Sequence, residues 1–439
     1  MKKLSAVESL LALPIQTSRR KKEQWLEPAE LAQLRAQRLR SVLAQARAAS
    51  YYRRVLPAPG DEATSTEAVS QLPILDKRIL AREGLDAFLT RGREGVLSIT
   101  TSGSTGEPAV FLRSPAEEAE FSARWWRVWA AYGGGPRDRL LNVGRTNTRP
   151  RSGAVNTLRK LGVLPKVVNI SVSAPVAESA RTLCEFKPQL VTGFAIGIEA
   201  LAEHMVEHDM RVPPPKVVIC GAMDVTDRCR DLVRRAFNSP AVNVYATNEF
   251  GVIAWECPAR PGVLHINDDM FVLEVLKGEE PVPDGTPGEI VLTSLTLTRM
   301  PLIRFRTGDV AARLPERCAC GRGLSCMTAV QGRTAHSIRA SGGRLITAPL
   351  LASAFGACGA YDWVRRFQVR EQENGVLCAI VVPGRLPTES ERQTLLRQLR
   401  DVTGGEFTIE LELRDELPLA PTGKFQYVVP AREKSQAAG

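Results

Sequence analysis

The chain has 439 residues, 44% of them hydrophobic, and a formal net charge of +10 from 58 Lys and Arg against 48 Asp and Glu. This hydrophobic content supports a packed core and excludes a disordered chain, and the length exceeds that of one ordinary domain. The charge is spread along the sequence. It is compatible with an anionic substrate, with weak affinity for nucleic acid or with a solvated basic surface, and it decides between none of them.

No targeting segment or membrane span is predicted. The short apolar stretch near the N-terminus is interrupted by Glu8, and no apolar run approaches the roughly 20 residues that cross a bilayer. Nine cysteines in a chain without a secretion signal favour reduced thiols or metal ligands over disulfides. We therefore expect a cytoplasmic protein.

The first elements in chain order are predicted to be helical. Residues 24–54 carry Leu and Val at spacings of three to five with charges between them, which is typical of an amphipathic helix. Residues 72–80 predict an extended entry and then a helix capped by Asp76. Residues 115–132 predict a helix rich in Trp, directly after a loop rich in Ser, Thr and Gly.

The middle of the chain indicates a parallel sheet. From about residue 138 to 295, short apolar runs alternate with helical stretches, a pattern typical of βαβ units. The runs 271–276 and 288–295 predict a β-hairpin or meander. The tail, 334–439, has strands and a helix in an α+β pattern, so a domain boundary is predicted near 330–333.

The loop between residues 100 and 108, "TTSGSTGEP", is predicted to bind phosphate. We expect it to connect a strand to a helix, where backbone N–H groups and hydroxyls form an anion-binding nest. It lacks the Lys of a GxxxxGK[ST] loop, so it is not that motif. The alternative is a flexible surface turn.

Four residues have the chemistry of a closed zinc site. Cys257 and His265 lie eight residues apart, and Cys318 and Cys320 lie two apart. Three thiolates and one imidazole fill a tetrahedral structural site and leave no position for water. The alternative is a set of unconnected buried thiols with a surface His. Cys326 is a spare candidate ligand.

Five motifs resemble those of the adenylate-forming enzymes, the superfamily of acyl-CoA synthetases and adenylation domains. They occur in the family's order, and they are "TTSGSTGEP", "VYATNEFG", "PLIRFRTGDVA", "VQGRTAHS" and "LAPTGKFQ". The resemblance implies an α/β fold with a large N-terminal domain, 1–332, of parallel or mixed sheets and helices. It also implies a small mobile α+β C-terminal domain, 333–439.

A narrower resemblance is to the phenylacetate–coenzyme A ligase branch, carried by 31–54, 72–80, 300–309 and "CACGR". It implies that ATP and Mg²⁺ activate an aromatic carboxylic acid to an acyl-adenylate, which then forms a thioester with coenzyme A. Some members of the branch hold zinc at positions that match the Cys and His residues above. A ligase that passes the acyl group to a carrier protein or an amine is the alternative.

The resemblance also implies roles for individual residues. The β- and γ-phosphates are expected on the loop residues Thr101, Ser102, Gly103, Ser104, Thr105 and Gly106. Tyr245, Asn248 and Arg333 are expected to bind the nucleotide, and Asp309 is expected to accept bonds from the ribose hydroxyls. Glu249, a hard oxygen ligand, is expected on Mg²⁺. Lys424 is expected to bridge the carboxylate and phosphate oxygens in the transition state.

An acyl pocket is expected between aromatic residues and small residues. The residues proposed for it are Trp126, Tyr132, Gly221, Ala222 and Ala246. The alternative for the aromatic stripe 125–132 is core packing, which is the more usual role of aromatic residues at helical spacing.

Some positions depart from the pattern of the family. Asn248 stands where the family prefers Thr, Ala335 and His336 stand where an acidic pair follows Gly-Arg, and Met223 stands where the branch has Glu. These departures leave open the hinge behaviour, the thioester step and the identity of the acid.

The expected partners are a small carboxylic acid and either coenzyme A or an acyl carrier protein. A zinc-bearing nucleic-acid-binding protein would account for the charge and the cysteines but not for Asp309, Lys424 or the hydroxyl-rich loop. We therefore expect neither nucleic acid nor membrane as a partner. The sequence is compatible with a homodimer.

Overall fold

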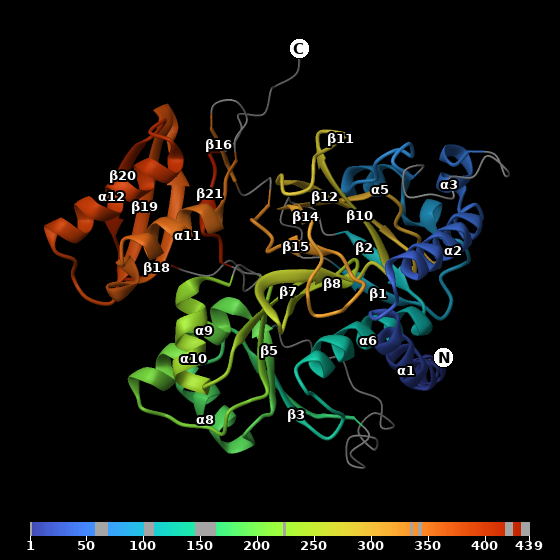
Figure 1. Ribbon diagram of the computed structural model, residues 1–439, viewed down its shortest axis with the longest axis horizontal. Coiled ribbons are helices and arrows are strands. Elements are labelled where there is room, and N and C mark those ends of the chain that lie inside the picture. Colours follow the sequence, from blue (N-terminus) through green and yellow to red (C-terminus); the bar gives the residue numbers. More distant parts are fainter. Residues whose placement is uncertain are drawn as a thin grey trace.

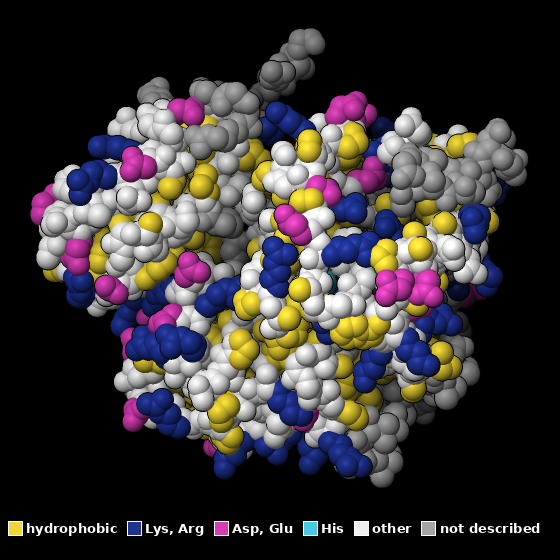
Figure 2. Space-filling model, in the orientation of Figure 1, with side chains coloured by type: hydrophobic (Ala, Val, Ile, Leu, Met, Phe, Trp, Pro, Cys, Tyr) yellow, Lys and Arg dark blue, Asp and Glu magenta, His cyan; other side chains and the backbone are white. Residues whose placement is uncertain are grey.

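The computed structural model describes residues 2–57, 69–100, 109–144, 164–222, 225–333, 337–340, 345–417 and 425–431. Figure 1 shows two groups of elements: a larger one formed by most of the chain, and a smaller one formed by its C-terminal part. On the face shown in Figure 2, Lys and Arg side chains are dispersed among other residues. Over the described residues, no helix combines the length and apolarity needed to cross a membrane.

A nine-stranded sheet in the order β14-β15-β9-β8-β7-β6-β5-β3-β4 runs through the larger group. Its strands are β3 (Arg139–Gly144), β4 (Lys166–Ser171), β5 (Leu190–Phe194), β6 (Val217–Gly221), β7 (Ala241–Thr247), β8 (Gly251–Cys257), β9 (Arg260–Ile266), β14 (Arg313–Leu314) and β15 (Cys326–Thr328). Neighbours from β4 to β7 are parallel, and the pairs from β7 to β14 are antiparallel. The expected parallel sheet of βαβ units is therefore confirmed.

Helices cover both faces of the parallel strands. One face carries α8 (Val176–Phe186), α9 (Ala195–Glu207) and α10 (Asp227–Phe237), and the other carries α6 (Pro115–Ala131). Val218 of β6 is buried with the first three helices, whereas its neighbour Ile219 is buried on the side of α6. Successive side chains of a strand point to opposite faces, so these central strands are apolar throughout.

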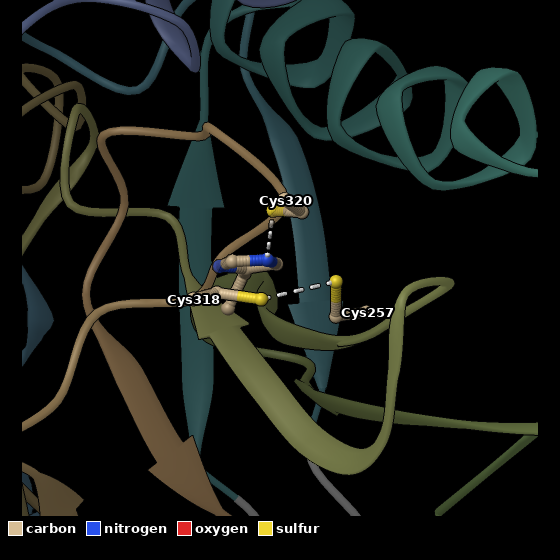
Figure 3. Close-up of side chains that lie close together, drawn as sticks. Cys257, Cys318 and Cys320 are labelled. Carbon is tan, nitrogen blue, oxygen red and sulfur yellow. Dashed lines mark hydrogen bonds between the residues drawn. The ribbon is translucent and has the colours of Figure 1, made fainter.

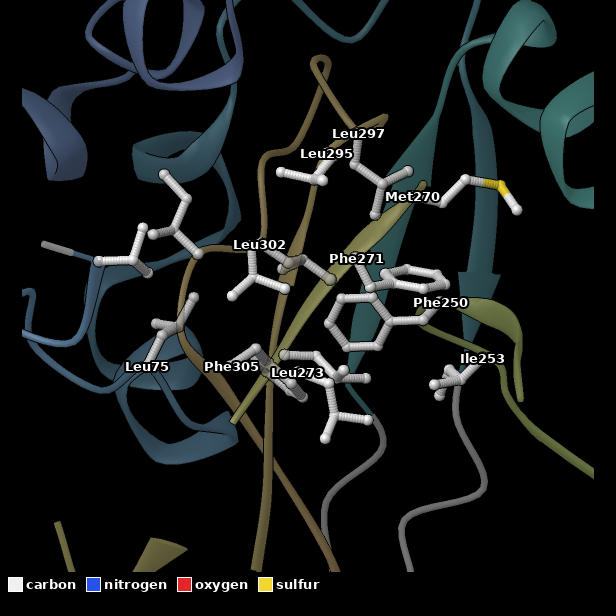
Figure 4. Packing of buried hydrophobic residues seen from close by; sticks show 14 of the residues in the cluster. Leu75, Phe250, Ile253, Met270, Phe271, Leu273, Leu295, Leu297, Leu302 and Phe305 are labelled. Atoms are coloured by element: carbon white, nitrogen blue, oxygen red, sulfur yellow. The ribbon is translucent and has the colours of Figure 1, made fainter. Parts of the chain in front are cut away.

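A second sheet, in the order β11-β10-β12-β13, packs beside the first. Its strands are β10 (Phe271–Lys277), β11 (Glu280–Pro281), β12 (Gly288–Ser294) and β13 (Phe305–Ala311). β10 pairs with β12 antiparallel, which confirms the predicted hairpin or meander. Figure 4 shows the core that joins the two sheets: Phe250, which follows β7, packs between Phe271 and Phe305, with both ring-centroid distances 5.8 Å.

The N-terminal region contains more helices than the sequence pattern predicts. They are α1 (Lys2–Glu23), α2 (Pro28–Ala46), α3 (Ser50–Val55), α5 (Lys77–Glu83) and the 3₁₀ turn η1 (Leu85–Phe88). The helical stretch predicted over 24–54 is divided because Ala49 is extended, with ψ 136°. The break turns Tyr51 onto Phe88, where the ring centroids are 4.6 Å apart. The Asp76 cap is confirmed, since its Oδ1 accepts from Ile79 N at 2.8 Å.

The loop rich in Ser, Thr and Gly connects two strands, and the expectation that a helix follows it directly is wrong. β1 (Leu97–Thr100) and β2 (Val110–Arg113) pair antiparallel on either side of it. The helix α6 begins only after β2, where Ser114 and Glu117 form a reciprocal capping box. The apolar run before Ser114 pairs with β1, and this run forms the additional strand.

The smaller group has the α+β organisation expected for the tail. It contains α11 (Ala348–Ala357), α12 (Glu389–Thr403), the 3₁₀ turns η4 (Ala360–Asp362) and η5 (Glu373–Gly375), and the strands β16 (Ile338–Arg339), β17 (Leu345–Ile346), β18 (Val364–Glu371), β19 (Val376–Pro383), β20 (Thr408–Leu413) and β21 (Val428–Val429). Its buried hydrophobic cluster draws on residues from Ile338 to Val428 alone. The boundary between 332 and 333 stays a prediction.

The two groups contact each other along α9. Ile196 is buried with Cys378 and Ile380 of β19, and Glu207 accepts from Arg365 of β18 at 2.7 Å. This contact surface combines a small apolar patch with exposed ion pairs, and exposed ion pairs contribute little to stability.

A buried ionic network joins α1 and α6 to the corner between β9 and β10. Asp269 is fully buried and accepts from Arg127 of α6 at 2.7 Å and from Arg20 of α1 at 3.2 Å. Arg20 also forms a bidentate pair with Glu120. Burial opposes ionisation of Asp269, but the Arg127 and Arg20 charges hold its pKa below the usual value. Arg20 belongs to the basic run near the N-terminus, yet it is 1% exposed.

We predict that Asp269→Asn destabilises the protein by about 3–5 kcal/mol, because it leaves the buried Arg127 guanidinium without its paired carboxylate and removes one of the three carboxylates around Arg20. The measurement is equilibrium unfolding in urea. Asp209→Asn is the matched control, since Asp209 pairs with Arg211 at a site where its side chain is 82% exposed. Equal unfolding midpoints for the two variants would contradict the assigned role of Asp269.

Candidate functional site

The carboxyl ends of the parallel strands meet the second sheet at Tyr245. Its buried hydroxyl donates to Asp309 Oδ2 at 2.7 Å, and Arg333 Nε donates to Asp309 Oδ1 at 2.9 Å. Burial and the Asp309 charge raise the pKa of Tyr245 well above its usual value. The structure thus brings together three of the predicted nucleotide residues, which come from β7, β13 and the segment after β15.

Glu249 lies in the turn between β7 and β8, buried to 8% exposure. Lys77 Nζ lies 3.0 Å from its Oε1. Lys77 is the first residue of α5, and that helix is placed by Leu75, whose N–H donates to Arg304 O at 2.9 Å beside β13. The pattern of 72–80 predicts only a helix start, and Lys77 is not among the predicted site residues. A cation directly after a capping Asp was the available signal.

The predicted residue Asn248 is exposed beside Glu249, and its backbone oxygen accepts from Arg113 Nη2 at 2.8 Å. Several predictions lie outside the described residues, namely Thr101, Ser102, Gly103, Ser104, Thr105, Gly106, Met223, Ala335, His336 and Lys424. Leu417 and Phe425, on either side of the Lys424 segment, are buried together with Ile196 of α9.

The residues predicted for the acyl pocket are found in two places. Gly221 ends β6, Ala222 follows it with φ +65°, and Ala246 lies near the end of the neighbouring β7. Tyr132 lies elsewhere along the sheet, where its hydroxyl donates to Glu256 O at 2.8 Å. Trp126 is half-buried on α6 and stacks edge-on against Trp129, with ring centroids 5.2 Å apart.

A cavity of about 200 Å³ opens on the face of β7 that carries Tyr245. Asn243, two residues before Tyr245, lines it together with Arg230 and Thr226 of the α10 region. Residues i and i+2 of a strand share a face, so Asn243 and Tyr245 point to the same side. The smaller group closes the cavity with Ala352 and Tyr427.

The four predicted metal ligands lie together. Ligand atoms of Cys257, His265, Cys318 and Cys320 are all within 4.8 Å of one another. The Cys257 and Cys318 sulfurs are 3.5 Å apart, and Cys320 Sγ lies 3.2 Å from His265 Nε2 (Figure 3). Cys326 falls outside this group and contacts the other ring nitrogen, His265 Nδ1, at 3.8 Å.

Burial shifts the pKa values of two predicted ligands in this cluster, His265 and Cys257. Burial, assisted by the charge of Arg322, lowers the pKa of His265 to about 4, so the imidazole is neutral at pH 7. Burial raises the pKa of Cys257 to about 12. A neutral imidazole is the form that binds a metal, and thiols lose their protons when a metal binds.

The fold is shared with solved structures of other proteins. The structure superimposes on a 2-hydroxyisobutyryl-CoA ligase in the postadenylation state, in complex with 2-HIB-AMP, with a TM-score of 0.78 over 94% of this chain and 92% of that one. At 19% identity this likeness establishes the fold, which is that of the adenylate-forming acyl-CoA ligases.

Comparison of the amino-acid sequence with those of known proteins gives more specific similarities. The chain is 28% identical over 298 residues to phenylacetate–coenzyme A ligase of Thermus thermophilus, covering 65% of this chain and slightly less than two thirds (66%) of the relative. It is 25% identical over 318 residues to the Escherichia coli enzyme of the same name, covering 70% and 71% of the two chains. No family model matches. In sequence the chain is thus similar to phenylacetate–coenzyme A ligases over about two thirds of its length.

Proposed function

We propose that the protein uses ATP to activate a carboxylic acid as an acyl-adenylate and then transfers the acyl group to coenzyme A. The observation that carries this proposal is the assembly of Tyr245, Asp309 and Arg333 beside Glu249, from segments far apart in sequence. The relatives are named as acid–CoA ligases, and the solved neighbour contains an acyl-adenylate.

The reaction has two steps. The substrate carboxylate attacks the α-phosphate of ATP, so a carboxylate oxygen–phosphorus bond forms while the α–β phosphoanhydride bond breaks and pyrophosphate leaves. The thiol of coenzyme A then loses its proton and attacks the acyl carbon, and AMP leaves with the bonding electron pair. Lys424 and the hydroxyl-rich loop, Thr101 to Gly106, are proposed to stabilise charge on the phosphates in the first step.

The nucleotide is proposed to bind with its ribose on Asp309 and its base toward the cavity beside Asn243. Asp309 already accepts two strong hydrogen bonds, from Tyr245 and Arg333, which hold its carboxylate in one orientation. Asn248 is proposed to contact the nucleotide through its exposed amide.

Glu249 is proposed to hold Mg²⁺, which would neutralise charge on the ATP phosphates. The carboxylate fits this role, because it is a hard oxygen donor and it already has a cation, the Lys77 ammonium, 3.0 Å away. Glu249 itself would bind and orient the Mg²⁺ ion. Because Glu249 is buried, water has restricted access to its carboxylate.

The acid is proposed to bind at the carboxyl edge of the sheet. Gly221, Ala222 and Ala246 have little or no side chain and lie at the ends of two adjacent strands, so they leave room for a planar ring. Trp126 and Tyr132 stay predictions as pocket walls. Tyr132 in particular already uses its hydroxyl on Glu256.

We also propose that residues 333–439 move as a small domain relative to 1–332. Gly332 has φ +110°, a backbone conformation that favours glycine and suits a hinge. The contact along α9 is held by the exposed Arg365–Glu207 pair and a small apolar patch around Ile196, so its separation costs little.

The thiol and imidazole cluster is proposed to hold one structural zinc ion. Cys257, His265, Cys318 and Cys320 supply four ligands, which fill a tetrahedral shell and leave no open position. The ion would stabilise the β8–β9 hairpin against the 318–320 loop. His265 is oriented for this task, since Cys326 contacts the ring nitrogen opposite the one that faces Cys320.

The function is tested with a panel of aryl and alkyl acids. We expect at least one acid to support ATP–pyrophosphate exchange and then to form a thioester when coenzyme A is added. Lys424→Ala should lower the exchange rate by about 10²–10³-fold, as loss of a charge-stabilising group does, whereas the exposed control Lys277→Ala should not. Exchange without a thioester would assign the acyl group to a carrier protein or an amine. Absence of exchange with every acid would overturn the proposal.

We predict that Asp309→Ala raises the KM for ATP about tenfold or more, because charge-assisted hydrogen bonds contribute roughly 1.5–3 kcal/mol each. The sharper measurement compares ATP with 2′-deoxy-ATP. The native enzyme should discriminate between them, and the variant should have lost most of that discrimination. Asp284→Ala, which changes an exposed loop carboxylate, is the control. Unchanged discrimination in Asp309→Ala would exclude the ribose role.

We predict about one zinc ion per chain in protein purified in metal-free buffer. Cys318→Ser should lose zinc and melt at a lower temperature, because the binding free energy of a structural metal is coupled to folding. The control is Cys184→Ser, because Cys184 lies on α8, outside the cluster. This variant should retain its zinc and its melting temperature. Elemental analysis measures the zinc content of each protein, and thermal melting measures its stability. Metal-free native protein, or full occupancy in Cys318→Ser, would show that the cluster does not bind zinc.

A further inference from the structure

Three residues around α6 form a compact stack beside Glu249. Arg113 is the last residue of β2, and Phe121 and Arg124 belong to α6. The guanidinium carbons of Arg113 and Arg124 lie 3.4 and 4.7 Å from the centroid of the Phe121 ring. All three side chains are buried. The aromatic ring therefore fixes the planes of two guanidinium groups through cation–π contact.

The same two arginines donate to the backbone on either side of Glu249. Arg113 Nη2 donates to Asn248 O at 2.8 Å, and Arg124 Nη1 donates to Phe250 O. Two rigid, planar guanidinium groups thus hold the backbone carbonyls of Asn248 and Phe250, the two neighbours of Glu249. The remaining freedom of Glu249 lies in its own side-chain torsions.

The next residue of the turn is constrained by the same ring. Gly251 has φ +72°, and a Cβ at this position would lie 2.6 Å from Phe121 Cδ1. The close approach of Phe121 requires glycine here, both for the backbone conformation and for the space. The turn from Asn248 to Gly251 therefore contacts the Arg113–Phe121–Arg124 stack at both of its ends.

Burial of the Arg124 guanidinium carries a large desolvation penalty, so packing alone does not explain an arginine at this position. Arg124 is fully buried, and burial lowers its pKa to about 9. Its guanidinium donates to Phe250 O, Thr296 Oγ1 and Met270 Sδ, so within the described residues its hydrogen bonds are made to neutral groups. An unpaired buried charge is costly, and an apolar side chain would fill the same space at lower cost. The hydrogen bond that Arg124 donates to the turn at Phe250 O is what an apolar side chain could not provide.

We propose that Arg113 and Arg124 are positioning residues that orient the Glu249 carboxylate toward the metal–nucleotide complex. The inference rests on the proposed function of Glu249. The two arginines act on the turn backbone, and Glu249 acts on the metal. A displacement of about 1 Å in such a group can cost on the order of 10²-fold in rate.

The test is a double-mutant cycle between Arg113 and Glu249. Arg113→Met should lower the rate of ATP–pyrophosphate exchange about tenfold or more in the native background. In the Glu249→Gln background the same change should cost less than about twofold, because residues that act through one group are not additive. Arg113→Lys keeps the charge but not the planar donor, and it should behave like Arg113→Met. It also serves as the deciding variant if Arg113→Met does not fold.

Binding of Mn²⁺ provides a readout without turnover. Titration in the presence of a non-hydrolysable ATP analogue, followed by electron paramagnetic resonance, should show weaker Mn²⁺ binding in Arg113→Met than in the native protein. It should show no further weakening when Arg113→Met is added to Glu249→Gln. The matched control is Arg139→Met, because Arg139 also donates to a backbone oxygen, that of Lys187, at 2.6 Å at the amino end of β3.

The outcomes separate this inference from the function on which it rests. Equal losses from Arg113→Met in both Glu249 backgrounds would overturn the positioning role while leaving the ligase activity intact. If no acid supports exchange, the proposed function fails, and the Mn²⁺ cycle still decides whether Arg113 acts through Glu249. A loss in Arg139→Met as large as that in Arg113→Met would likewise contradict the inference.

Discussion

Asp269 lies fully buried between Arg127 of α6 and Arg20 of α1, at the corner where β9 leads into β10. Its neighbour Asn267 accepts from Arg127 and from the Trp255 indole, so the same corner also holds the centre of β8. In a medium of low dielectric, such a network is stable only when every charge has its partner. The position of α6 against both sheets therefore depends on this corner.

The position of α6 matters because the helix contacts the site along its length. Ser114 begins it directly after β2, and Phe121 and Arg124 support the turn that carries Glu249. The β8–β9 hairpin is then held at two points, by the Asn267 corner and by the thiol and imidazole cluster around His265. A hairpin with both ends restrained presents the Glu249 turn in one conformation, which is what pre-organised charge stabilisation requires.

Local patterns predicted much of this architecture. The alternation of apolar runs and helical stretches predicted the parallel sheet, and Asp76 predicted a helix start. Prediction was weaker where burial overrides local chemistry. Arg20 lies in a basic run that resembles a solvated surface, yet three carboxylates surround it in the folded chain. Likewise, the cation after the capping Asp in 72–80 did not by itself indicate that Lys77 reaches Glu249, since that contact spans more than half of the larger group's sequence.

The order of residues along the chain specifies the available chemistry: which carboxylates, thiols, imidazole and glycines are present, at which spacings, and which runs form strands or helices. Which of these groups come into contact follows from the folding of distant segments onto one another. This folding brought Asp309 to Tyr245, gathered Cys257, His265, Cys318 and Cys320, and assigned Cys326 to the far side of the imidazole ring. The reason is physical. Periodicity and capping are properties of neighbouring residues, whereas these contacts depend on packing and burial between segments that are distant in the chain.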